Sequence, residues 1–207
     1  MAIGEIHPAA IKIDRLVDRI RDGDIKIPAF QRGFVWDQEQ ITELLDSIYC
    51  NYPIGSILLW SSHERLKASR NIGGLKLPDR EPDYPVNYVL DGQQRLSTIY
   101  AVFCAHREFE SGDSGYAADP RVFEIAFRFD DEAFIPLTVA EASRPSISLS
   151  CLFDTESFFK ALEVLTPDNQ KAARLLHSRI NNYEIPVVTI SKRSKDDVGV
   201  IFERINS

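Results

Sequence analysis

The chain has 207 residues, a formal net charge of −7 at pH 7, 44% hydrophobic residues and 27% charged residues. This size and composition fit one α/β or α+β domain with a substantial core, or two small domains. The acidic balance excludes a generally basic protein that wraps nucleic acid, so any DNA contact must come from a local patch.

The sequence lacks targeting and metal-binding signals. No apolar run approaches the roughly 20 residues of a membrane span, and the first residues do not form a signal peptide. Cys50, Cys104 and Cys151 are far apart in apolar surroundings, which predicts reduced core thiols. The 4 histidines are scattered, so we expect no structural zinc. These features predict a cytoplasmic protein without a membrane partner.

Apolar periodicity and turn residues predict the elements in chain order. Asp37 and Gln40 form a plausible capping box, and Thr166 with Pro167 predicts another helix start. Residues 61–85 predict a surface loop or ragged hairpin, and residues 133–150 an irregular segment. The predicted elements are 11–27 (short strand, helix, extended return), 38–52 (helix), 54–60 (strand), 87–91 (strand), 93–109 (helix), 121–130 (strand), 155–165 and 167–181 (helices), 183–190 (strand) and 196–207 (helix).

The most informative stretch is residues 87–100, an apolar strand, an Asp91-Gly92 turn and a helix whose first turn carries two glutamines and Arg95. A helix N-terminus holds partial positive charge and unpaired N–H groups, so a cation there is mildly unfavourable unless an anion faces it. A phosphate fits, because backbone, amide and guanidinium donors would converge on it and Gly92 would let it approach closely. The alternative is an ordinary turn in which Asp91 caps the helix.

Two further motifs carry weaker signals. Gln31 and Arg32 lie between Phe30 and Phe34; they predict a second phosphate contact or a nucleobase stack, or merely a surface turn that Phe30 and Trp36 anchor. Basic residues in the 61–85 loop predict either a DNA-facing element or a solubilising loop.

The last predicted helix places a carboxylate and an amide, Glu203 and Asn206, three residues apart on one face. Such a pair could hold Mg²⁺ bound to phosphate oxygens, although charged residues there could equally form a solvated helix edge. The sequence contains no P-loop motif, no GxSxG motif and no Cys/His nucleophile pattern, which excludes the enzyme classes that depend on them.

Three blocks in this order resemble the N-terminal domain of GmrSD-type modification-dependent (type IV) restriction proteins. They are Ile27-Pro28-Ala29-Phe30-Gln31-Arg32 with Trp36, the DGQQR block from Val89 to Thr98, and Ile201 to Ser207. The resemblance implies an α+β, ParB/sulfiredoxin-like fold with a mixed sheet and flanking helices. It implies one NTP-binding domain over residues 1–207, with a helical insertion at 130–182. The abrupt ending predicts that this is the front part of a longer protein.

The resemblance also implies site residues. Arg95 would neutralise phosphate charge, while Asp91 would orient Arg95, order the turn or assist the attacking water. The implied nucleotide or phosphate ligands are Gln31, Arg32, Gly92, Gln93, Gln94, Arg95, Ser97 and Arg204; the implied catalytic residues are Asp91, Gln94 and Arg95; the implied metal ligands are Glu203 and Asn206.

The implied function is an Mg²⁺-dependent NTPase that senses modified DNA in anti-phage defence. It would license cleavage by an HNH-type nuclease domain on the same or a partner chain, and a homodimer is one option for its assembly. The alternative is a nucleotide- or DNA-binding switch that does not hydrolyse its ligand. Nuclease activity of this chain alone is not expected, since the sequence has no dense acidic cluster.

Overall fold

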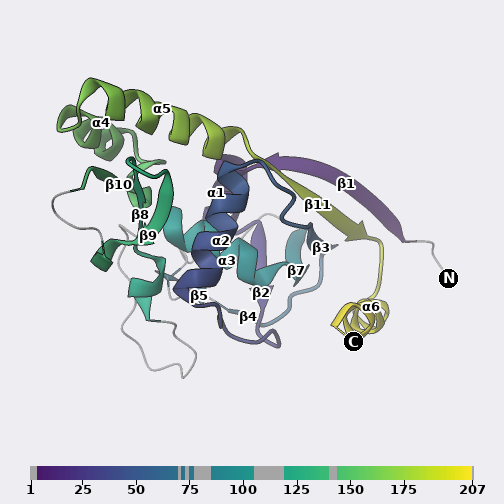
Figure 1. The fold of residues 1–207 in the computed structure, drawn as a ribbon. Coiled ribbons are helices and arrows are strands. Elements are labelled where there is room, and N and C mark those ends of the chain that lie inside the picture. The colour runs from purple at the N-terminus through teal and green to yellow at the C-terminus, as the bar shows by residue number, and fades with distance from the viewer. Residues whose placement is uncertain are drawn as a thin grey trace.

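The computed structural model describes residues 4–69, 71–72, 75–76, 85–104, 119–139 and 144–206. A mixed sheet forms its centre (Figure 1). The strands of this sheet are β1 (Glu5–Lys12), β2 (Ile25–Pro28), β3 (Ile57–Ser62), β4 (Ala68–Ser69), β7 (Val86–Asp91) and β11 (Glu184–Ser191). Their order is β1-β11-β3-β7-β2-β4, so β7 is an interior strand.

Helices flank the sheet, and two smaller sheets accompany it. The helices are α1 (Ile13–Arg21), α2 (Gln38–Tyr49), α3 (Gln93–Cys104), α4 (Thr155–Glu163), α5 (Pro167–Asn182) and α6 (Lys195–Asn206), with short 3-10 turns η1 (Pro120–Phe123), η2 (Leu137–Val139) and η3 (Leu149–Cys151). The smaller sheets consist of β5 (Asn71–Ile72) with β6 (Leu75–Lys76), and of β8 (Ile125–Arg128), β9 (Ala133–Pro136) and β10 (Ser146–Ser148). The predicted α+β class with a mixed sheet and flanking helices is confirmed.

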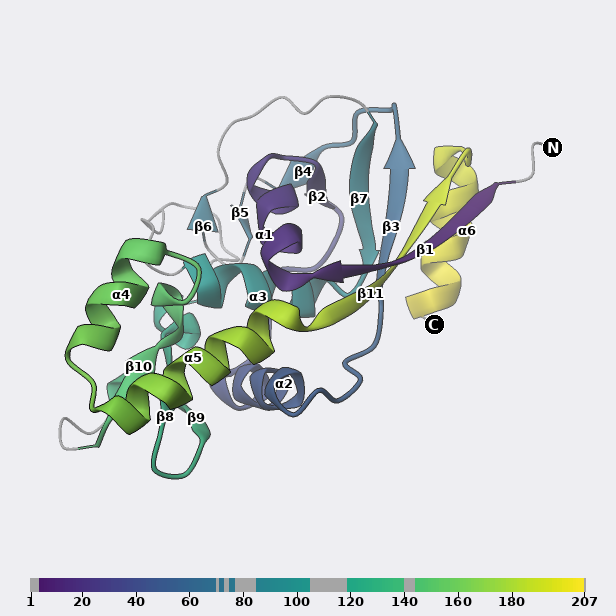
Figure 2. The same ribbon diagram turned by 90° about the horizontal axis from the view of Figure 1, so that it is seen from above.

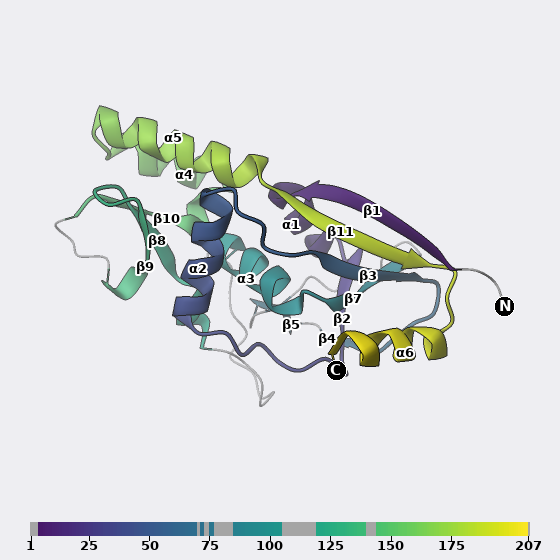
Figure 3. The same ribbon diagram turned by 45° about the vertical axis from the view of Figure 1, so that its right-hand side comes forward.

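The two faces of the large sheet are covered differently, as the views in Figures 2 and 3 show. Helices α1, α2, α3 and α5 share the larger hydrophobic core, into which Leu59 of β3 and Val89 of β7 point. Helix α6 covers the opposite face, where Val198 packs with Trp60, Tyr88 and Leu90. The alternation of side chains along a strand explains this division, because neighbouring residues point to opposite faces.

The helix starts predicted from clear capping signals are confirmed, although α2 ends at Tyr49 rather than residue 52. The Asp37 side chain accepts a hydrogen bond from the backbone of Gln40, and the reciprocal bond completes the capping box of α2. Thr166 caps α5 with Pro167 in its first turn. Helix α1 ends before Gly23, which has a φ of 78°.

Several predicted strands have different bounds. Strand β1 starts at Glu5 rather than near Ile11, because it is a largely exposed edge strand without apolar alternation. Strand β3 starts at Ile57 rather than Ile54, since a loop with Gly55 at a φ of 82° precedes it. In the predicted strand 121–130, the first residues form η1 and only β8 is extended.

The segment 133–150, predicted to be irregular, contains β9 and β10, which pair with the two edges of β8. The predicted insertion 130–182 therefore contains strands as well as α4 and α5, and it packs into the larger core. Of the 61–85 loop, the structure describes the start, the three two-residue strands β4, β5 and β6, and the end. The end of the helix predicted to reach residue 109 lies outside the described residues.

The cysteine prediction is partly wrong. Cys104 is buried and Cys151 is partly buried, but Cys50 is exposed because it follows the last turn of α2 at the surface. None of the three forms a disulfide bond. Within the described residues, no helix has the length and apolar character needed to cross a membrane.

Candidate functional site: a polar pocket at the start of helix α3

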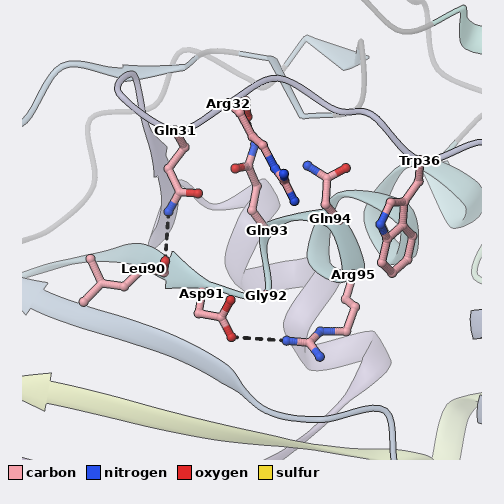
Figure 4. A pocket seen from close by; sticks show the side chains of 9 residues that line it. All are labelled: Gln31, Arg32, Trp36, Leu90, Asp91, Gly92, Gln93, Gln94 and Arg95. Atoms are coloured by element: carbon pink, nitrogen blue, oxygen red, sulfur yellow. Dashed lines mark hydrogen bonds and ion pairs between the residues drawn. The ribbon is translucent and has the colours of Figure 1, made fainter. Parts of the chain in front are cut away.

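A pocket of about 200 Å³ opens where β7 ends and α3 begins. Figure 4 shows the nine residues that line it. They come from the segment after β2 and from the β7–α3 junction, and they are Gln31, Arg32, Trp36, Leu90, Asp91, Gly92, Gln93, Gln94 and Arg95. The structure thus brings together most of the residues that sequence reasoning assigned to nucleotide binding and catalysis.

Gly92 makes the sharp turn between strand and helix. Its φ is 85°, and a Cβ there would lie 3.2 Å from Ile57 Cγ1 and 3.3 Å from Arg95 Nη2. The backbone conformation therefore favours glycine, and a larger residue would also require its neighbours to shift by a few tenths of an ångström. Gly92 has no side chain that could cap α3, and no side chain among the described residues accepts a hydrogen bond from the first backbone N–H groups of the helix. These groups can receive an anion.

Arg95 lies in the wall of the pocket and holds the loop before β3. Its Nη1 donates to the carbonyl of Ile54 at 2.8 Å, and its Nη2 donates to the carbonyl of Ser56 at 2.9 Å. Nη2 also pairs with Asp91 Oδ2 at 3.4 Å (Figure 4). A guanidinium has five N–H groups, so donors remain for a ligand after these contacts.

The glutamine side chains join the two segments that form the pocket. Gln94, which is 8% exposed, donates to the carbonyl of Gly33 at 3.1 Å and accepts from the N–H of Val35 at 2.9 Å. Gln93 Nε2 donates to the carbonyl of Arg32 at 2.7 Å. Both amides therefore fix the segment after β2 against α3.

Gln31 makes the reciprocal connection. Its Nε2 donates to the carbonyls of Val89 and Leu90, at 2.8 and 3.1 Å, near the end of β7. The amides that sequence reasoning assigned to phosphate binding thus have structural partners. Their role toward a phosphate stays a prediction.

Arg32 is the cation in the pocket that has no ion pair or side-chain hydrogen bond among the described residues. Its side chain is exposed, and Figure 4 shows the guanidinium reaching toward Gln93 and Gln94. Asp91 is paired with Arg95, so Arg32 leaves the pocket with one uncompensated positive charge. The start of α3 adds partial positive charge beside it.

Ser97 and the described side chains of α6 do not line this pocket. Ser97 is 1% exposed within α3 and does not line the pocket. Glu203 lines a second pocket beside α6, and Arg204 is exposed on that helix. The side chain of Asn206 lies outside the described residues.

The donor set of the first pocket can be compared with what Mg²⁺ requires. No group of three or more His, Cys, Asp or Glu side chains suited to a metal occurs in the described parts of the chain. Mg²⁺ is, however, commonly held by one or two carboxylates together with substrate phosphates. The carboxylate of Asp91 in the pocket wall fits that arrangement.

Sequence reasoning missed the loop between α2 and β3. Ile54 and Ser56 supply the carbonyls that bind Arg95, and Gly55 lies against its guanidinium. The available signal was a glycine two residues after Pro53 and just before an apolar strand. Such a glycine is typical of a turn with positive φ or of a close approach.

The fold and the pocket define an α+β domain with a polar site at a strand–helix junction. Residues 13–207 match the GmrSD restriction endonuclease N-terminal domain, and the chain belongs to this family. It is also similar to the uncharacterized protein MJ0686 of Methanocaldococcus jannaschii, with 24% identity over 229 residues. That similarity covers 92% of this chain and 38% of the archaeal protein, so the chain spans well under half the length of this relative.

Proposed function

We propose that this domain binds and hydrolyses a nucleoside triphosphate and thereby licenses DNA cleavage by a separate HNH-type nuclease domain. In this proposal it is the sensor half of a restriction system directed against modified DNA. Membership of the restriction endonuclease family supports the restriction role. The observation that carries the nucleotide part is that, among the described residues, Arg32 has no ion pair and the start of α3 beside it has no side-chain cap.

The dimensions and charge of the pocket support a phosphate ligand. A volume of about 200 Å³ is smaller than the roughly 300–1,000 Å³ that encloses a drug-sized molecule. The pocket therefore suits the phosphates rather than the whole nucleotide. Arg32 and the N–H groups of α3 would bind the phosphate oxygens, as charge-assisted hydrogen bonds favour.

Hydrolysis requires stabilisation of charge and a positioned water molecule. Arg95 would contribute its remaining N–H groups, and the loop carbonyls of Ile54 and Ser56 would hold it in place. Asp91 would accept a proton from the water or share in binding Mg²⁺, which supplies charge neutralisation when bound. Glu203 and Asn206 stay predicted metal ligands, and Glu203 lines the second pocket rather than this one.

The experiment is a phosphate-release measurement on the purified chain, with and without Mg²⁺ and modified DNA, together with nucleotide affinity. Arg32→Ala should weaken nucleoside triphosphate binding by about tenfold to a hundredfold, as expected for one charged hydrogen-bonding group. Asp91→Asn should retain binding and lose turnover. Binding without phosphate release by the wild-type chain would favour the non-hydrolysing switch, and unchanged affinity of Arg32→Ala would contradict the proposed site.

A further inference from the structure

A second pocket lies beside α6, and the Phe30–Arg32 segment contributes residues to both pockets. Its volume is about 220 Å³ and its lining is mainly apolar. Three aromatic residues contribute to it, Phe30, Trp60 and Phe202, from the segment after β2, from β3 and from α6. Leu66, Val198 and Gly199 complete the apolar lining.

The aromatic residues form a preorganised site for a flat ligand. Phe30 and Phe202 meet edge to face, with ring centroids 5.3 Å apart. Trp60 is 1% exposed and packs with Tyr88 at 5.9 Å, whereas Phe30 is 56% exposed. The pocket thus combines a buried inner wall with an outer wall open to solvent, and aromatic walls favour stacking with a planar ring.

Trp60, one of the lining residues, carries an indole N–H group without a hydrogen-bond partner among the described residues. Trp60 Nε1 is buried and makes no hydrogen bond within the described residues. Leaving a buried donor unpaired is unfavourable, and native proteins rarely do so without a reason. A planar ligand whose acceptor atom reaches Nε1 would satisfy this N–H group, whereas a purely aliphatic ligand would not.

The chain connects the two pockets directly. Phe30 lines the second pocket, and the next two residues, Gln31 and Arg32, line the first. Leu90 lines the first pocket and belongs to the same hydrophobic cluster as Trp60 and Val198. A ligand that reaches across Phe30 and Gln31 would therefore enter both pockets.

We infer that the second pocket receives the base of the nucleoside triphosphate whose phosphates bind in the first pocket. This inference rests on the proposed function. Neither pocket has the volume to enclose a whole nucleotide, but the first is polar and cationic while the second is aromatic and apolar. A nucleotide has the same division between its phosphates and its base. Lys195 adds a hydrogen-bond donor for the edge of the base.

The two tryptophans of the chain report the two pockets separately, because Trp36 lines the first and Trp60 lines the second. In a Trp36→Phe variant all tryptophan fluorescence comes from Trp60. ATP, GTP, CTP and UTP would be titrated, with inorganic tripolyphosphate as the ligand without a base. We expect at least one nucleotide to change Trp60 fluorescence, while tripolyphosphate leaves it unchanged.

Gly199 allows the second pocket to be filled with little strain. It lies in α6, and a Cβ built there meets no atom within 4 Å. Gly199→Leu should lower the affinity for the bound nucleotide by at least about tenfold and leave the affinity for tripolyphosphate unchanged, as calorimetry on the full chain would measure. Gly199→Ala is the matched control and should change both affinities by less than about twofold.

The possible failures are distinguishable. If the wild-type chain binds neither tripolyphosphate nor any nucleotide, the proposed function itself is wrong. If nucleotides bind, but Gly199→Leu does not weaken them and Trp60 does not respond, the phosphate site stands and the base site is overturned. A response of Trp60 to a short single-stranded oligodeoxynucleotide but to no mononucleotide would also overturn it, because the pocket would then serve a base of DNA.

Discussion

Arg95 and Gly55 are complementary: the guanidinium of Arg95 occupies the space that a side chain at residue 55 would need. A Cβ on Gly55 would overlap Nη1 of Arg95, and the φ of Gly55 is 82°. The carbonyls on either side of this glycine, from Ile54 and Ser56, accept the hydrogen bonds of the same guanidinium. The loop before β3 and the DGQQR segment therefore form one structural unit.

The first prediction concerns Gly55→Ala. It should destabilise the fold by about 2 to 4 kcal/mol, because it adds backbone strain at positive φ and displaces Arg95. Urea unfolding would measure this loss. Gly199→Ala is the matched control, since that glycine is helical with open space around it, and it should be neutral or stabilising by up to about 1 kcal/mol. Equal stabilities of the two variants would argue against the fit between Gly55 and Arg95.

The second prediction separates the two arginines of the first pocket. Arg95→Ala should cost about 2 to 4 kcal/mol of stability, because it leaves two loop carbonyls and Asp91 without their cation. Arg32→Ala should change stability by less than about 0.5 kcal/mol, since its side chain is exposed and unpaired among the described residues.

Unfolding curves of both variants, measured beside nucleotide affinity, would check this prediction. A stable Arg95→Ala protein would show that the loop does not depend on the guanidinium. The comparison also makes Arg32→Ala the cleaner test of ligand binding, because loss of function in Arg95→Ala would mix a folding effect with a binding effect.

The parts of the fold that sequence reasoning predicted are those with strong local signals. Helix α2 has both a capping box and an apolar face, and Ile41, Leu45 and Ile48 are fully or almost fully buried as that pattern requires. Strand β1 has no such pattern, because it is an edge strand held by β11 and exposed along most of its length. Its strand conformation depends on a partner that lies far away in the sequence.

In the candidate site, too, contacts between residues that lie far apart in the sequence could not be predicted. The DGQQR segment was identified from its strand–turn–helix context, and the pocket forms there. The hydrogen bonds of Gln94 to Gly33 and Val35 could not be read from the sequence, because those residues lie about sixty positions away. A glutamine in a motif can bind a ligand or a neighbouring backbone, and local pattern does not distinguish these roles.

The third prediction concerns the order in which the cysteines react with iodoacetamide. Burial raises the pKa of the Cys151 thiol to about 11, and its Sγ contacts the carbonyl of Ser148 at 2.9 Å. Cys104 is buried, whereas Cys50 is exposed. Because the thiolate is the nucleophile, Cys50 should be alkylated first in the native protein at pH 8. Mass spectrometry of peptides would check this order, and early labelling of Cys151 would contradict the placement of η3.

The fourth prediction is a dependence of stability on pH through His177. Its imidazole stacks on Phe158, with ring centroids 5.0 Å apart, and lies 6.4 Å from Phe153. Burial among these groups lowers the pKa of His177 from its usual 6.5, because the charged form loses hydration.

As the pH falls through 6.5, the unfolded chain therefore binds a proton at residue 177 before the folded protein does. The contribution of His177 to stability is fully present above pH 6.5 and is lost as the pH falls through the lower pKa of the folded state. Urea unfolding at a series of pH values should give a steeper loss of stability below pH 6.5 for the wild type than for His177→Gln. An NMR titration of the His177 ring should give a midpoint below 6.5, and a midpoint above it would reverse the sign of the expected effect.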